Sequence, residues 1–213
     1  MSRRGALRAV GLVLALAGLV IVASIGWQLW GTTYISHRRQ AETVDDLHKA
    51  WRDGAVEVKT DHGTATAVVL IPEFGEDYEV PLLEGTSDDV LASGFGHLPG
   101  TAGPGETGNF AIAGHRITQG EPLRHMPDLD PGDQVLVATA DEVYVYELDT
   151  GGDDLEVSFT ADWVLRPQPV NPDAGGVGPI SAPQLLTLTT CADLFHSDER
   201  WVAFGHLVET RPR

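Results

Sequence analysis

The sequence predicts an all-β domain, closed or sandwiched, that follows an apolar N-terminal helix. Two observations support this fold class. Residues 9–30 form an uncharged apolar run, whereas from about Ala55 onward short β-branched segments alternate with turns rich in Gly, Pro, Asp and Asn. Residues 55–213 have the length of one domain rather than two, and many short strands with little helix are typical of a barrel or sandwich.

The charge distribution divides the chain in nearly the same place. Residues 1–41 hold five arginines and no acid, whereas residues 42–213 hold nine basic residues and all 31 acidic ones. Phosphate recognition needs clustered Lys and Arg, so the acidic part argues against nucleic-acid binding. An apolar fraction of 42% is ordinary for a packed domain. A single cysteine excludes an internal disulfide framework and a thiolate-rich zinc site.

The apolar run, Ala9–Trp30, is predicted to be a membrane anchor. At about 1.5 Å per residue it reaches roughly 33 Å, enough for the hydrocarbon core. The arginines before the run outweigh Arg38 and Arg39 after it, so the positive-inside rule places the N-terminus in the cytoplasm and residues 38–213 outside. We therefore expect a single-pass protein of the plasma membrane with an extracellular domain. A cleaved secretory signal is the alternative, and it also exports the domain.

The segment that follows is predicted to be a stalk. Ser36–Asp53 is polar and favours a helix, with Val44, Leu47 and Trp51 at spacings of three and four. Trp51 is expected to make only a weak apolar contact. The expected organisation is a basic N-terminus, an anchor, a juxtamembrane stalk and one folded domain, with the bounds 1–8, 9–30, 31–54 and 55–213.

The expected strands of the folded domain are short, and the best hairpin covers residues 134–149 with its turn at 140–142. The other segments with strand character are 55–59, 66–71, 78–83, 109–115, 185–191 and 201–208. Two longer loops cover residues 94–108 and 166–183. Long loops over a β scaffold are the usual place for binding residues.

The candidate site combines a thiol, an imidazole and a guanidinium. Cys191 ends an apolar strand that turns polar at its close; a lone cysteine is most often a small buried hydrophobe, but here it is also a nucleophile candidate. His115 ends another apolar strand. Arg200 stands among acids before the last strand, either in a weak surface ion pair or as a cation that stabilises an oxyanion and a thiolate. Histidine pairs with zinc spacing do not occur, and no cofactor is expected.

These residues carry a resemblance to a known family. The segment TLTTC at 187–191, with Arg200 nine residues later and His115 upstream after a strand, resembles the TLxTC…R signature of the sortases. The run HLPGTAGPGETGNFAIAGHR and the N-terminal anchor look most like class E sortases of actinobacteria. The similarity spans nearly all of residues 64–210. It implies a closed, eight-stranded sortase-type β-barrel with short helices.

The resemblance also implies the reaction, a cysteine transpeptidation of exported proteins. Cys191 would attack the Thr carbonyl of a C-terminal sorting motif of the LPxTG or LAxTG type, and His115 would protonate the departing Gly amine. Arg200 would bind the substrate backbone and the oxyanion. The thioacyl enzyme would then transfer the protein to an amine of a cell-wall precursor peptide. Substrate contacts are expected from Thr189, Thr190, His97 and Leu98.

The sorting motif and the function both stay open. Leu98 replaces the tyrosine common in class E sortases, so the sequence does not decide between LPxTG and LAxTG. Two functions remain as alternatives to the transpeptidase. One is a catalytically silent, membrane-tethered β-barrel that binds peptide or cell-wall ligand, and the other is a thiol peptidase that transfers the acyl group to water.

Overall fold

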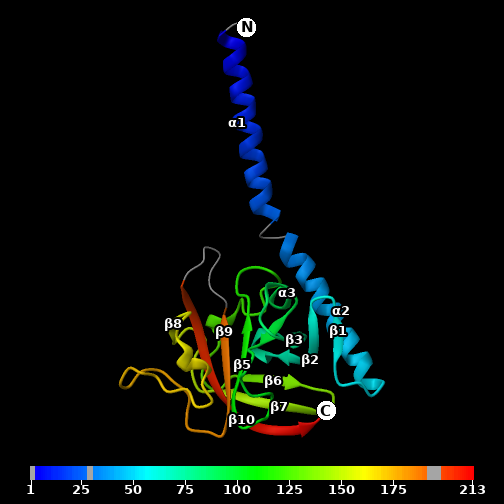
Figure 1. Ribbon diagram of the computed structural model, residues 1–213, viewed down its shortest axis with the longest axis vertical. Coiled ribbons are helices and arrows are strands. Elements are labelled where there is room, and N and C mark those ends of the chain that lie inside the picture. The colour runs from blue at the N-terminus through cyan, green and yellow to red at the C-terminus, as the bar shows by residue number, and fades with distance from the viewer. Residues whose placement is uncertain (1–2, 28–30, 191–197) are drawn as a thin grey trace.

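The computed structural model describes residues 3–27, 31–190 and 198–213 (Figure 1). Cys191 lies outside the described residues, as does Trp30 at the end of the predicted anchor. The chain forms two long helices followed by a β-domain with short helical turns.

Eight strands close into a barrel, which confirms the predicted fold. Going around it, the strands are β2 (Gly63–Leu70), β3 (Val80–Glu84), β4 (Phe95–His97), β5 (Gly108–Gly114), β9 (Gln184–Thr190), β10 (Glu199–Pro212), β7 (Glu142–Leu148) and β6 (Gln134–Ala138). Pairing of β6 with β2 closes the ring. Two strands lie outside it: β1 (Val58–Thr60) pairs with β2, and β8 (Glu156–Ser158) pairs with the start of β10.

Most predicted strands occur within a few residues of their expected bounds, and the hairpin of β6 and β7 is confirmed. Two strands were not predicted. Strand β4 falls in the expected loop 94–108 and β8 in a turn-rich segment, and each has only three residues. A strand of three residues is too short to display a period of two, so its existence depends on the neighbour that pairs with it.

The barrel interior holds the main core, because alternate side chains of each strand point inward. Phe110 and Ile112 of β5 meet Leu186 and Leu188 of β9 there, and all four are fully buried. The outer face of β10 carries a second cluster. Its buried members come from β10, from η4 (Asp162–Leu165) and from the residue before β8, and they are Leu155, Trp163, Val164, Val202 and Phe204.

The other helical elements are short. Helix α3 (Asp88–Leu91) begins with Ser87 as its N-cap, whose hydroxyl accepts a hydrogen bond from the backbone N–H of Val90 at 3.4 Å. The turns η2 (Pro72–Phe74) and η3 (Met126–Asp128) each carry Pro in the first turn, where the missing N–H costs nothing.

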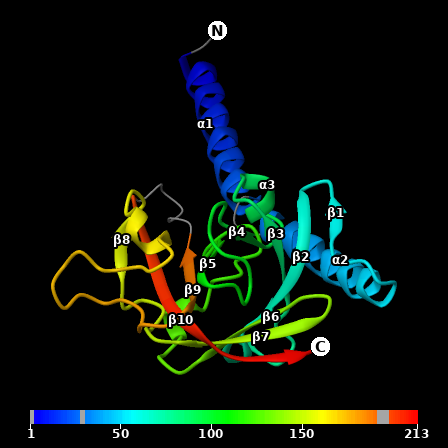
Figure 2. The ribbon, with the colours of Figure 1, turned by 60° about the horizontal axis from the view of Figure 1, so that its bottom comes forward.

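The predicted stalk helix, α2 (Thr32–Arg52), packs along the outside of the barrel beside β1, β2 and β3 (Figure 2). Its apolar positions, Val44, Leu47 and Trp51, are buried against the barrel. Trp51 is 6% exposed, and the guanidinium of Arg213 lies 4.6 Å from its ring centre. The helix therefore contacts the domain more extensively than the weak contact predicted for Trp51.

Helix α1 (Arg3–Gly26) projects away from the barrel (Figure 1). Large apolar side chains along residues 12–22 are more than half exposed. Within the part of the chain whose side chains are described, no helix combines the length and apolarity needed to cross a membrane.

Candidate active site

Two parallel strands bring the ends of the predicted catalytic segments together. Strands β5 and β9 pair in parallel along their whole length, and the last pair in register is Gly114 with Thr190. Parallel strands end at the same edge of a sheet. His115 directly follows Gly114, and Cys191, outside the described residues, directly follows Thr190 in the sequence.

Strand β10 brings Arg200 to the same edge. It runs antiparallel to β9 with Val202 opposite Thr189, and the backbone N–H of Trp201 donates to the Thr190 hydroxyl at 3.2 Å. Side chains directly opposite one another share a face of the sheet, and positions two apart along a strand share it too. Arg200 therefore lies on the face of Val202 and Thr189, which is the outer face of the barrel.

The His115 side chain is largely enclosed, and its Nε2 is buried with no hydrogen-bond partner among the described residues. Burial lowers the pKa of His115, and the carboxylate of Asp88 on α3 raises it by a smaller amount. Buried polar atoms are normally paired, so an unpaired imidazole nitrogen at a strand end indicates a functional position.

Arg200 shows the same feature. It is half-buried at the start of β10, where it pairs with Val157 of β8, and its Nε is buried without a hydrogen-bond partner in the described part of the chain. A guanidinium presents its N–H donors in a rigid fork that suits carboxylates and oxyanions. The edge formed by β5, β9 and β10 thus offers one acid–base group and one fixed cation.

A second arginine supports this edge. The guanidinium carbon of Arg116 lies 4.2 Å from the centre of the Trp201 ring, a cation–π geometry. The indole N–H of Trp201 donates to the carboxylate of Glu156 on β8 at 3.1 Å. Arg116 directly follows His115 in the sequence, but its stacking partner lies 85 positions away, so no local pattern predicts this contact.

A family model described as "Sortase domain" matches residues 69–208. The chain belongs to the sortase family. Sortase SrtE1 of Streptomyces coelicolor is 34% identical over 97% of this chain, and sortase SrtE2 of the same organism is 27% identical over 96%. The chain spans 58% of the length of SrtE1 and 83% of that of SrtE2.

Solved structures show the same relationship. Sortase E from Streptomyces avermitilis matches with a TM-score of 0.61 and 36% identity, covering 72% of this chain and 93% of that one. A crystal structure of sortase E1 from Streptomyces coelicolor, with a tripeptide in its active site, matches with a TM-score of 0.58 and 34% identity, covering 73% and 94%. The predicted resemblance to class E sortases is confirmed.

Thr189 and Thr190 of this sortase are 3% and 4% exposed, and their hydroxyls bind the sheet itself. The Thr189 hydroxyl donates to the Trp201 carbonyl at 3.2 Å, and that of Thr190 accepts from the Trp201 amide. Both threonines therefore tie the end of β9 to the start of β10. Their predicted contact with substrate stays a prediction.

His97 and Leu98 lie farther down the barrel. The backbone N–H of Leu98 donates to the carbonyl of Ala111 on β5 at 2.9 Å. Ala111 lies four residues before His115, and this separation is about 13 Å along an extended strand. The His97 ring lies 5.3 Å from the Phe110 ring and contacts Glu84 at 3.1 Å and the Ala102 carbonyl at 2.9 Å. The structure does not bring these two residues to the His115 end, and a substrate role would require an extended peptide.

Sequence reasoning missed Asn109 as an organiser of the outer face. Its amide N–H groups donate to the carbonyls of Val164 and Arg166 at 2.9 and 3.1 Å, and its amide oxygen accepts from the Thr187 hydroxyl at 2.8 Å. Asn109 is 1% exposed, so this network anchors the start of the 166–183 loop next to β5 and β9. The available signal was a polar side chain in an otherwise apolar strand, NFAIAG.

The described residues contain no group of three or more His, Cys, Asp or Glu side chains arranged to hold a metal ion. Acid–base and electrostatic chemistry by His115 and Arg200 is what the described edge can supply.

Proposed function

We propose that this chain is a cysteine transpeptidase in which Cys191 is the nucleophile, His115 the acid–base group and Arg200 the oxyanion and substrate cation. The observation that carries the proposal is the pairing of Gly114 with Thr190. His115 and Cys191 are the next residues in the sequence after these two paired positions. The unpaired Nε2 of His115 and Nε of Arg200 at the same edge support it. Membership of the sortase family supports the reaction class.

The first half of the reaction forms a thioester. The Cys191 thiolate attacks the carbonyl carbon of the Thr in a sorting motif, and the carbonyl oxygen takes up the negative charge beside the Arg200 guanidinium. When the tetrahedral intermediate collapses, the C–N bond to Gly breaks. The His115 imidazolium gives its proton to that nitrogen, so the amine departs neutral.

The second half returns the enzyme to its starting state. An amine of the cell wall attacks the thioester carbon, and neutral His115 accepts the proton that the amine loses. The C–S bond breaks, a new amide forms, and Cys191 leaves as thiolate.

The substrate class follows from the same proposal. Exported proteins with a C-terminal sorting motif of the LPxTG or LAxTG type would donate the acyl group, and a cell-wall precursor peptide would accept it. The tripeptide in the active site of the Streptomyces coelicolor relative supports a peptide substrate. An extended peptide from the Cys191 end would reach Leu98 and the 166–183 loop, which Asn109 holds beside β5.

We also propose that residues 9–30 anchor the enzyme in the plasma membrane with the barrel outside. The exposed apolar side chains of α1 support this, because water is a poor solvent for a continuous apolar surface. After cell fractionation, the chain should stay in the membrane pellet through an alkaline carbonate wash and be released by detergent. Recovery of a shortened chain in the soluble fraction would show a cleaved signal instead.

The reaction is tested with the full chain and two synthetic peptides that carry LPxTG and LAxTG, each with and without an amine acceptor. We expect mass spectrometry to show the acceptor conjugate, and Cys191→Ala to abolish it while the far-UV circular dichroism spectrum stays unchanged. Free acid as the sole product in the presence of the amine would identify a thiol peptidase. Binding of either peptide without turnover would identify a silent barrel.

A further inference from the structure

The loop that follows His115 has an unusual backbone. Gln119, Gly120 and Glu121 are consecutive and have positive φ angles of 56°, 84° and 46°. Left-handed backbone is uncommon for residues with a side chain and costs free energy, so it persists where the surroundings hold it in place. Two of these three residues carry side chains, so contacts with other parts of the molecule must hold them in this conformation.

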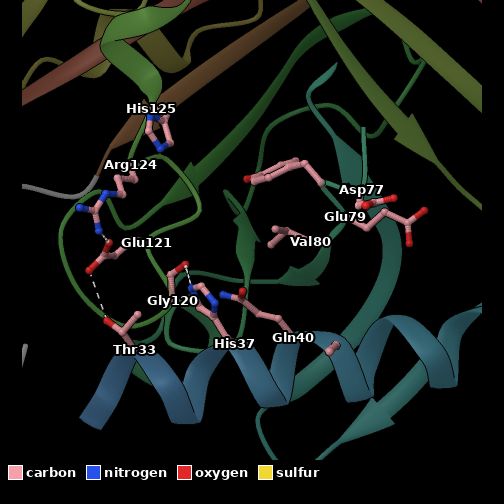
Figure 3. Close-up of a pocket in the computed structure, with 12 residues that line it drawn as sticks. Thr33, His37, Gln40, Asp77, Glu79, Val80, Gly120, Glu121, Arg124 and His125 are labelled. Atoms are coloured by element: carbon pink, nitrogen blue, oxygen red, sulfur yellow. Dashed lines mark hydrogen bonds and ion pairs between the residues drawn. The ribbon is translucent and has the colours of Figure 1, made fainter. Parts of the chain in front are cut away.

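Helix α2 supplies that restraint. The Nε2 of His37 lies 2.9 Å from the carbonyl oxygen of Gly120, and the Thr33 hydroxyl donates to the Glu121 carboxylate at 3.3 Å (Figure 3). The helix and the loop touch at Gly120: a Cβ there would lie 2.4 Å from the Gln40 amide nitrogen and 3.0 Å from Ser36 Cβ. Gly120 is thus required both for its φ and for this close approach.

On one side the loop borders a cavity and not packed side chains. This cavity of about 380 Å³ lies between the first half of α2 and the barrel, and the loop residues Gly120, Glu121 and Arg124 form one of its walls (Figure 3). Space beside a strained segment gives it room to relax when its polar contacts are removed. The position of the loop on this side therefore depends on the hydrogen bonds from α2.

The far end of the loop is tied to His115 itself. The Leu123 amide donates to the His115 carbonyl at 2.9 Å, and the Leu123 side chain is fully buried. The Tyr78 hydroxyl donates to the Pro122 carbonyl at 2.6 Å. A shift of residues 119–121 would consequently be transmitted to the backbone that carries the His115 ring.

We propose that His37 is a positioning residue of the active site: by donating from Nε2 to the Gly120 carbonyl, helix α2 holds the 116–123 loop and so sets where the His115 ring lies. This inference rests on the proposed catalytic role of His115. On this proposal, helix α2 contributes to the geometry of the active site and does not serve only as a spacer before the barrel. A carbonyl accepts but does not donate, so His37 must carry its proton on Nε2.

The test compares His37→Ala, His37→Gln and Arg38→Ala in the full chain purified in detergent. Gln can still donate an N–H to Gly120, and Arg38 lies on the exposed side of the same helix with 72% of its side chain accessible. The readouts are kcat and KM for peptide cleavage, and the pKa of the His115 ring from NMR titration, assigned by its loss in His115→Ala. Asp88 on α3 is the charged group that acts on the ring, and every variant keeps it.

We expect His37→Ala to lower kcat between about tenfold and a hundredfold at nearly constant KM. The pKa of His115 should rise toward about 6.5 as the ring becomes more hydrated. His37→Gln and Arg38→Ala should both match the wild type. If His37→Ala leaves too little folded protein, Thr33→Val removes the second contact and should cause the same two shifts.

Equal kcat and equal His115 pKa in His37→Ala and Arg38→Ala would overturn the proposal, as would a loss in His37→Gln as large as that in His37→Ala. The NMR titration separates this inference from the proposed function. If the wild type cleaves no peptide, the proposed function fails, while the His115 pKa still reports whether α2 positions the ring.

Discussion

The guanidinium carbon of Arg116 lies 4.2 Å from the centre of the Trp201 ring. Arg116 follows His115 in the chain, and Trp201 follows Arg200, so each partner is the direct neighbour of a proposed catalytic residue. Strand β9 lies between β5 and β10 in the sheet, and the stack therefore joins the segments on its two sides. The contact limits how far the imidazole and the guanidinium can separate.

A double-mutant cycle with Arg116→Met and Trp201→Leu measures this contact. We expect a coupling free energy of about 0.5–2 kcal/mol in urea unfolding, because the pair is partly shielded from water. Arg124→Met is the matched control: Arg124 belongs to the same connection, is 67% exposed and pairs with Glu121. Its coupling to Trp201→Leu should be zero within error, and a similarly small value for Arg116 would show that the stack contributes nothing.

Removal of the acid–base group and of the cation should each impair the reaction. We expect His115→Ala and Arg200→Ala to lower kcat/KM by about 10²–10⁴ each. The double variant should be little worse than the poorer single one, because groups that act in one step are not additive. The measurement is peptide cleavage under steady-state conditions with His62→Ala as the control. Fully multiplicative losses would mean that the two residues act independently.

Stability should depend on pH through His115. Burial places the pKa of the folded state below that of the unfolded chain, about 6.5. Between these two values the unfolded chain binds more protons, so the stabilisation is present above about pH 6.5 and is lost as the pH falls through the pKa of the folded state. Urea unfolding between about pH 7.5 and 5.5 should show a steeper decline for the wild type than for His115→Gln. Parallel curves would contradict a buried neutral imidazole.

The Asn109 network should be worth more to stability than a surface hydrogen bond. Asn109→Ala leaves the Arg166 carbonyl without its partner and removes three hydrogen bonds from the network, although the Thr187 hydroxyl still donates to the Val164 carbonyl at 3.1 Å. We expect the free energy of unfolding to fall by about 1–3 kcal/mol, the cost of buried polar groups without partners. Gln168→Ala, which removes an exposed bond to the Ala182 carbonyl, is the control. A loss no larger than that of the control would indicate that the loop is held by other contacts.

The strand pattern was predictable to a large extent because it is local. Leu186 and Leu188 alternate with the polar Thr187 and Thr189, which is the period of two typical of a strand, and β9 forms over that segment, buried on both faces. The stalk helix was predictable from Val44, Leu47 and Trp51 for the same reason. Its docking was not, because the surface that receives these side chains comes from Ala65, Val68, Leu83 and Val90, on other segments of the chain.

By itself, the sequence determined the fold class, the sortase signature and the three residues proposed for catalysis. Each depends on a short local pattern of residues: alternation along strands, the segment TLTTC, and a histidine at a strand end. Only the tertiary structure decided which groups meet. It placed Gly114 beside Thr190, Arg116 over Trp201, and His37 against the Gly120 carbonyl. These partners lie more than 70 residues apart, and their contacts arise from barrel closure and helix docking, in which every strand pairing constrains the others.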